Sequence, residues 1–224
     1  MTARQPQHHP HPETLMSHVA GTLPNAISCV VACHASLCRQ CADQIRWLGM
    51  LGGIMLKNVD ADADDHVFKD DAAAHWSADM LPPRKLLHDP APKIDDPLLP
   101  RPLARHLGIG GDDVPWRKVV KGVRQHWVKL PKGSGQIRLL RLAPGKELLE
   151  HTHTGMELTM VLQGIYGDHS GEYQRGDVIE WEEGSVHQPH ASLGEEECVC
   201  LIGSENIPHY SRLVARLLRP IIGF

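Results

Sequence analysis

The chain has 224 residues and a formal net charge of −4, with 42% hydrophobic and 22% charged residues. These proportions exclude a disordered or collagen-like chain, and the length suits one large domain or two small ones. The small negative charge, with no long block of lysine or arginine, excludes an electrostatic surface for direct nucleic-acid binding. Any role in transcription would therefore require a protein partner.

The sequence carries no membrane or secretion signal. No apolar run approaches the roughly 18 residues of a membrane span, and the start MTARQPQHHP lacks the apolar region of a signal peptide. We therefore expect a cytoplasmic protein without membrane contact. In a reducing cytosol, six cysteines and sixteen histidines are better explained as metal or redox groups than as disulfides. The cysteines form two groups, Cys29, Cys33, Cys38 and Cys41, and then Cys198 and Cys200.

The first quarter of the chain predicts helices. Apolar residues recur at helical spacing over 13–55, and Pro24 interrupts the pattern, so we expect two or three short helices there. A further helical stretch is expected over 72–80. The chain between residues 81 and 115 is rich in proline, which excludes regular structure over most of the span and indicates a linker at 83–115.

After the linker the pattern changes to short β-like runs separated by glycine turns. About seven such runs at this spacing predict an all-β sandwich or barrel over 116–210. The tail 211–224 is expected to add a short helix. The runs are 119–123, 126–130, 137–142, 157–163, 165–168, 178–181 and 198–202.

The first group of candidate metal ligands is His34, Cys38 and Cys41. On a helix, spacings of four and three would place the three side chains on one face. Imidazole and thiolate are the ligands that tetrahedral zinc prefers, and a closed structural site needs a fourth ligand. Cysteines packed as small core residues are the alternative. For the fourth ligand we favour His9, with four competitors: His8, His11, His18 and Cys33.

The second group lies in the β-rich part. His151 and His153 are two residues apart and share one face of a strand, Glu157 follows, and His187 comes after a glycine turn. Three imidazoles and one carboxylate inside a small β-barrel suit zinc, iron, manganese or nickel. Four polar residues on a solvated barrel face are the alternative.

The N-terminal pattern resembles a known domain. A short helical segment with His34-x3-Cys38-x2-Cys41 and a histidine about 25 residues upstream is similar to the zinc-binding anti-sigma domain. In that family the upstream histidine precedes a turn like Ala20-Gly21-Thr22-Leu23. Counting back from this turn selects His9 as the fourth ligand, with His8 and His11 close by.

The C-terminal pattern resembles the cupin superfamily. Its first motif matches as Gly145-x5-His151-Thr-His153-x3-Glu157-x6-Gly164, and its second matches through Gly176, Gly184 and His187. The resemblance implies that His151, His153, Glu157 and His187 are the metal ligands. Two departures affect the second motif, because Glu182 and Glu183 replace its usual proline and Ala191 replaces its terminal asparagine.

The two patterns in this order resemble the ChrR-type family of zinc-binding anti-sigma factors. The resemblance implies an α + β two-domain protein, with an all-α zinc-binding domain at 1–82 and an all-β cupin barrel at 116–210. It implies two zinc ions per chain, one per domain, and no catalytic turnover. It also implies that the chain inhibits an extracytoplasmic-function sigma factor, and releases it when the cupin domain senses singlet oxygen or organic hydroperoxides.

Other residues are candidates for the partner surface and for redox chemistry. A helical domain can present an apolar face to a partner helix, although at least half of these apolar residues are expected to form its own core. Cys198 and Cys200 share one face of a predicted strand and form a candidate redox pair, with buried structural thiols as the alternative. The candidate partner-binding residues are Leu15, Val19 and Leu23, or Trp47, Leu51 and Ile54.

Two other functions fit parts of the sequence. A three-histidine, one-glutamate cupin site with iron performs dioxygen chemistry, so a metal-dependent cupin dioxygenase with an accessory zinc domain is the main alternative. The histidine-rich start suggests a metal-storage protein instead. Metal analysis separates these functions, because the regulator should hold about two zinc ions and the enzyme should hold iron.

Overall fold

The structure is a computed structural model that describes residues 4–57 and 96–206. One compact unit consists of Met1–Ile45 and Ile94–Phe224, and a second consists of Arg46–Lys93. The predicted helices at 72–80 and 211–224, and the predicted boundaries at 82 and 210, lie outside the described residues.

Three helices open the chain, as the sequence predicted. They are α1 (Pro12–Val19), α2 (Asn25–Ala35) and α3 (Arg39–Lys57). Proline at the first position of α1 is favourable, because its missing N–H would have no partner inside the helix. Pro24 precedes α2 directly, so it separates the two helices without disturbing either one.

The segment after residue 95 corrects the predicted linker. Residues 101–107 form helix α4 (Arg101–Leu107), and Gly111–Asp113 form a short 3-10 helix, η4. Leu103 and Ala104 are fully buried. The prolines were misread because Pro100 caps α4 and Pro102 lies in its first turn, where a missing N–H costs no helical hydrogen bond. The Asp96 carboxylate fixes the chain that leads into α4, because it accepts hydrogen bonds from the backbone N–H groups of Leu98, Leu99 and Gly111.

The β-domain contains three antiparallel sheets, and together they do not close into a barrel. The large sheet has the order β1-β2-β3-β11-β5-β8. Its strands are β1 (Arg117–Val120), β2 (Val123–Val128), β3 (Gln136–Leu142), β11 (Cys198–Ser204), β5 (Glu157–Gln163) and β8 (Val178–Trp181). The second sheet consists of β10 (His190–Ala191), β6 (Ile165–Asp168) and β7 (Gly171–Gln174), and the third of β4 (His151–Thr152) and β9 (Val186–His187).

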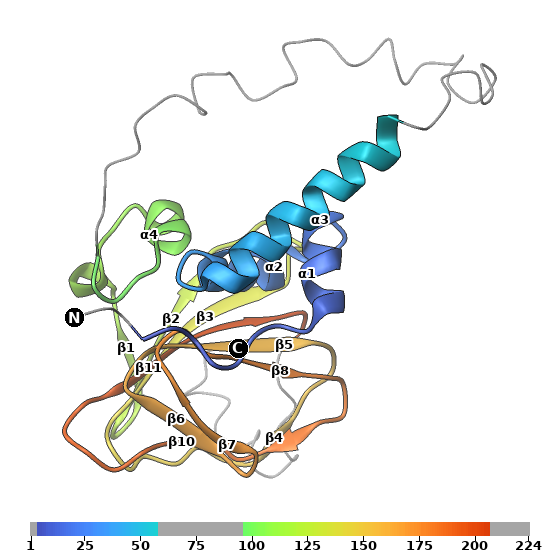
Figure 1. Ribbon diagram of the computed structural model, residues 1–224. Coiled ribbons are helices and arrows are strands. Elements are labelled where there is room, and N and C mark those ends of the chain that lie inside the picture. Colours follow the sequence, from blue (N-terminus) through green and yellow to red (C-terminus); the bar gives the residue numbers. More distant parts are fainter. Residues whose placement is uncertain (1–3, 58–95, 207–224) are drawn as a thin grey trace. The chain divides into compact units, whose positions relative to one another are not determined.

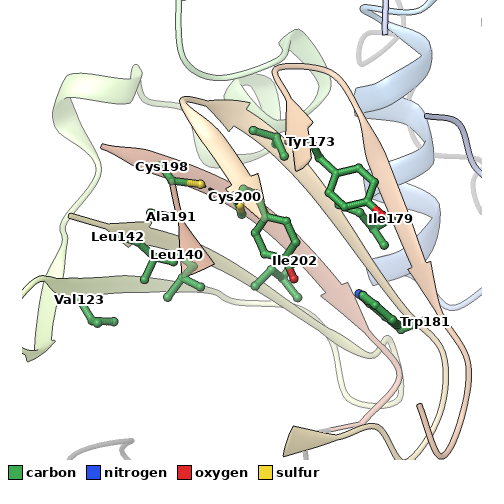
Figure 2. Packing of buried hydrophobic residues seen from close by; sticks show 12 residues of the cluster. Val123, Leu140, Leu142, Tyr173, Ile179, Trp181, Ala191, Cys198, Cys200 and Ile202 are labelled. Carbon is green, nitrogen blue, oxygen red and sulfur yellow. Dashed lines mark hydrogen bonds between the residues drawn. The ribbon is translucent and has the colours of Figure 1, made fainter. Parts of the chain in front are cut away.

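The core of the β-domain lies on the inner face of the large sheet, where Figure 2 shows the packed side chains. Helix α2 contacts the other face, on β11 and β5 (Figure 1). All of β11 and nearly all of β5 are therefore buried on both faces, which explains their continuous apolar sequences. Gly203 permits this contact, because a Cβ there would lie only 2.6 Å from the carbonyl oxygen of Ala26.

Candidate metal centres

The first cluster brings together His9, His34, Cys38 and Cys41, whose ligand atoms lie within 4.8 Å of one another. Nδ1 of His9 lies 3.3 Å from Nε2 of His34, 3.4 Å from Sγ of Cys38 and 3.5 Å from Sγ of Cys41. His34 and both cysteines are buried, and His9 is partly buried. The predicted fourth partner therefore lies in the cluster, and the donor set is compatible with a bound metal ion.

The route by which the chain forms this cluster differs from the predicted single helix face. His34 lies in the last turn of α2, Cys38 immediately precedes α3, and Cys41 lies in its first turn. Helix α2 ends at Ala35, and the Ser36 hydroxyl donates to the carbonyl of Cys33. The prediction failed because spacings of four and three also suit a tight turn, in which the Cys38 N–H still donates to the His34 carbonyl.

The competitors for the fourth position each have other partners. The His8 ring lies 3.5 Å from a carboxylate oxygen of Asp177, and the His11 ring lies 3.8 Å from one of Glu180. His18 lies 2.8 Å from the hydroxyl of Ser28. The hydrogen bond with Cys29 and burial raise the pKa of the Cys33 thiol, which stays protonated.

His9 belongs to an N-terminal strap, residues 4–11, that lies along the edge strand β8 (Figure 1). The Val178 N–H donates to the His8 carbonyl, and Asp177 accepts backbone N–H groups from Gln7 and His8 at 2.6 and 3.2 Å. Burial alone would raise the pKa of Asp177, but hydrogen bonds from Gln174, Gln7 and His8 hold it below its usual range. This carboxylate is therefore ionised near neutral pH and anchors the strap.

The protonation states of the first cluster favour a cation. Burial lowers the pKa of His34 to about 4, so its imidazole is neutral at pH 7. Burial and the neighbouring Cys38 raise the pKa of Cys41 to about 12. Two adjacent buried thiols lose their protons readily only when a positive charge lies between them, and a bound metal ion supplies that charge.

The second cluster brings together His151, His153, Glu157 and His187, with ligand atoms within 4.8 Å of one another. His151 and His187 pair across the β4–β9 ladder, and their Nε2 atoms lie 2.9 Å apart. Glu157 begins β5, and one of its carboxylate oxygens lies 3.6 Å from Nδ1 of His153. Each of the four residues is at most 5% exposed, which rules out a solvated barrel face.

Two atoms of this cluster are buried without a hydrogen bond in the described structure, Nε2 of His153 and Oε2 of Glu157. Burial raises the pKa of Glu157 and lowers the pKa values of His151 and His153 to about 4 and about 3. Buried polar atoms normally have partners, so neutral imidazoles facing an unsatisfied carboxylate oxygen indicate a missing cation. The donor set is compatible with metal binding.

Neighbouring groups orient the rings of this second cluster. Nδ1 of His151 lies 3.0 Å from the carbonyl oxygen of Leu149, and Nδ1 of His187 lies 3.3 Å from the Tyr166 hydroxyl and 3.7 Å from Asp168. Both histidines therefore direct Nε2 into the cluster, as ligand histidines usually do. Sequence reasoning missed Tyr166 and Asp168. Strand alternation over 165–168 was the available signal, since it puts these two residues on one face.

Comparisons with known proteins identify the family of the chain. Residues 105–208 match the family described as the ChrR cupin-like domain. The chain is 33% identical over 216 residues to the anti-sigma-E factor ChrR of Cereibacter sphaeroides, and the match covers 96% of this chain and 97% of that protein. The chain belongs to the ChrR family of anti-sigma factors. Its structure is also similar to a chain in the crystal structure of Rhodobacter sphaeroides SigE in complex with the anti-sigma ChrR, with a TM-score of 0.69 and 31% identity, covering 89% of this chain and 100% of that chain.

Membership of the ChrR family confirms the resemblance and the helical-then-cupin architecture inferred from the sequence. The described helices include none that is long and apolar enough to cross a membrane. Of the candidate partner-binding residues, Leu15 is only 1% exposed and belongs to the core, while Val19 and Leu23 are partly buried. Three residues of α3 remain open, Trp47 at 61%, Leu51 at 41% and Ile54 at 55% exposure.

Cys198 and Cys200 lie on the same face of β11, as strand alternation predicted. Their sulfur atoms are 3.7 Å apart, and each residue is 1% exposed (Figure 2). The hydrogen bond with Cys198 and burial raise the pKa of Cys200. In this conformation both thiols lie in the core, so reaction with an oxidant requires the oxidant to enter the core.

Proposed function

We propose that this chain binds and inhibits an extracytoplasmic-function sigma factor and releases it during oxidative stress sensed through the cupin domain. The similarity to an anti-sigma factor over almost the whole of both chains carries this proposal. A cytoplasmic location is part of this proposal, because a sigma factor acts on RNA polymerase inside the cell. The same similarity favours a regulator over the dioxygenase, because it includes the N-terminal helices, for which a small-molecule enzyme has no use.

Zinc is the proposed ion in the first cluster. Zinc bonds of about 2.0–2.3 Å in a tetrahedron place ligand atoms about 3.3–3.8 Å apart. Nδ1 of His9 lies 3.3 to 3.5 Å from the other three donor atoms. Two thiolates and two imidazoles are a structural zinc set, and zinc there would tie the strap to the start of α3.

Zinc is also the proposed ion in the second cluster, which gives two ions per chain. His151, His153, Glu157 and His187 would hold it, and the ion would supply the positive charge that the buried Glu157 carboxylate lacks. Three nitrogens and one oxygen also suit iron or manganese, so the choice of zinc rests on the resemblance to the family.

The apolar face of α3 is the proposed contact with the sigma factor. Trp47, Leu51 and Ile54 are spaced by four and three residues, which forms one stripe along a helix. All three are more than 40% exposed. An exposed apolar stripe of this kind docks into a groove of a partner or against a partner helix.

Segment 174–181 is the proposed link between the sensor and the sigma-binding region. At one end, Asp177 binds the strap that carries His9. At the other end, Trp181 stacks on His153 of the second cluster, with ring centroids 6.1 Å apart and planes 7° apart. A change in the second cluster that moves β8 would therefore alter the first cluster, and β8 is the proposed two-state element that couples the two sites.

Co-expression with the extracytoplasmic-function sigma factors of the source organism, followed by pull-down and transcription assays, tests the function. We expect the chain to capture one sigma factor and to block transcription by RNA polymerase that depends on it. Trp47→Ala with Leu51→Ala should weaken capture, whereas Leu149→Ala, an exposed leucine of the β-domain, should not. A zinc-loaded chain that captures none of these sigma factors would refute the proposal.

A further inference from the structure

A cavity of about 200 Å³ lies at the β1-β2-β3 end of the large sheet, covered by segment 146–149. None of the four residues of the second cluster lines it. Figure 2 shows Val123 and Leu140, which line it from adjacent strands with their side chains on the same side of the sheet. Its apolar lining consists of Val119, Val120, Val123, Leu140, Leu148 and Leu149.

Two polar side chains in this apolar lining lack partners. Gln125 is 3% exposed, and its amide has no hydrogen bond to residues 4–57 or 96–206. Nε of Arg138 is buried and equally without a hydrogen bond in the described chain, and its guanidinium stacks over Trp127 at 5.4 Å. A buried polar group without a partner costs about 1–3 kcal/mol, so Nε of Arg138 indicates a missing ligand, and the Gln125 amide in the same lining is available to that ligand.

The charge of the cavity comes from Arg138. Lys146 and Glu147 also line the cavity, and their opposite charges offset each other. Arg138 forms no ion pair with a described carboxylate, although its charge opposes the effect of burial on the pKa of Glu157. A purely internal role for Arg138, as a distant counter-charge to Glu157, is the competing explanation, and it would give the cavity no preference for anions.

We propose that this cavity binds a small organic monocarboxylate whose apolar body contacts the valines and leucines, and whose carboxylate contacts Arg138 and Gln125. Benzene fits an apolar cavity of about 150 Å³, so about 200 Å³ accommodates a ring or a short chain with one carboxylate. The planar guanidinium matches the two oxygens of a carboxylate. Leu149 lines the cavity, and its backbone carbonyl oxygen lies 3.0 Å from Nδ1 of His151. A ligand in the cavity would therefore lie beside the second cluster.

Calorimetric titration of the purified full-length chain with three isosteres tests this proposal, independently of sigma-factor binding. Benzoate, benzamide and benzamidine have the same shape and carry charges of −1, 0 and +1. We expect benzoate to bind with a Kd on the order of 0.1–1 mM, and the other two to bind about 10-fold more weakly or worse. Equal affinities for all three, or no benzoate binding at about 10 mM, would overturn the proposal.

Two variants separate the contribution of Arg138 to benzoate binding from the general effects of substitution on the protein. Arg138→Gln should weaken benzoate binding about 10-fold, to the level of benzamide. Arg124→Gln is the matched control, because Arg124 pairs with Glu197 and does not line the cavity, and it should bind benzoate as the parent does. If Arg138→Gln fails to fold, Leu148→Trp replaces it, since a tryptophan in the covering segment should fill the cavity and abolish binding. Benzoate binding that is lost on zinc removal but unaffected by these changes would assign it to the metal and refute the cavity.

Discussion

Nδ1 of His34 donates a hydrogen bond to the backbone carbonyl of Gly176, 2.8 Å away. His34 belongs to the first cluster, and Gly176 precedes the carboxylate that anchors the N-terminal strap. The β-domain therefore orients a candidate ligand of the helical region directly. This bond leaves Nε2 of His34 directed toward His9 and Cys41.

Gly176→Ala should destabilise the chain and loosen zinc in the first cluster. Gly176 has φ of 91°, and a Cβ there would lie 2.7 Å from Pro6 of the strap. We expect a loss of about 1–3 kcal/mol in urea unfolding and faster zinc transfer to a chromophoric chelator. Gly133→Ala is the matched control, because Gly133 has φ of 80° but no atom within 4 Å of that position. Equal rates of zinc transfer from the two variants would show that the contact between Gly176 and the strap has no role in holding zinc.

His9→Ala should reduce the zinc content from about two ions per chain to about one, because only three donors would remain in the first cluster. His8→Ala should retain both ions, since its ring faces Asp177. Elemental analysis of the purified variants by mass spectrometry measures this directly. Loss of zinc from the His8 variant, with full retention in the His9 variant, would reverse the assignment.

Asp177→Asn should remove stability in a pH-dependent manner. The folded-state pKa of Asp177 lies below its usual value, so its contribution is fully present above about pH 4 and is lost as the pH falls through the folded-state pKa. We expect the parent chain to be more stable than the variant by about 1–3 kcal/mol at pH 7, and the gap to narrow in acid. Urea unfolding at several pH values gives both free energies, and a gap independent of pH would contradict the ionised anchor.

His187→Ala should leave sigma-factor inhibition intact but abolish induction by singlet oxygen. His187 lies in the second cluster, whereas the proposed sigma-binding face lies on α3. A reporter gene dependent on the sigma factor, measured with and without an illuminated photosensitising dye, records both properties. His126→Ala, outside both clusters, should behave as the parent does. Normal induction in the His187 variant would remove the second cluster from the signalling mechanism.

Local spacing in the sequence was sufficient to predict most of both clusters. His151 and His153 follow the two-residue period of a strand, and Cys38 and Cys41 lie within one turn, so short-range geometry brings them together. Local rules failed at α4, where prolines at a helix start were taken for a linker. They also failed at the α2–α3 junction, because the spacings of four and three between His34, Cys38 and Cys41 fit both a helix face and a tight turn.

The sequence by itself determined the change from helices to strands along the chain and the donor types of both clusters, since these depend on neighbours a few residues away. Only the tertiary structure places His9, and not His8, in the first cluster, because the strap meets Asp177 across 169 residues of chain. It also decided that Arg138 lines a cavity and forms no ion pair with a described carboxylate, while Arg141 on the same strand pairs with Glu197. Such contacts depend on which strands and segments meet in space, and no local period in a single sequence records that.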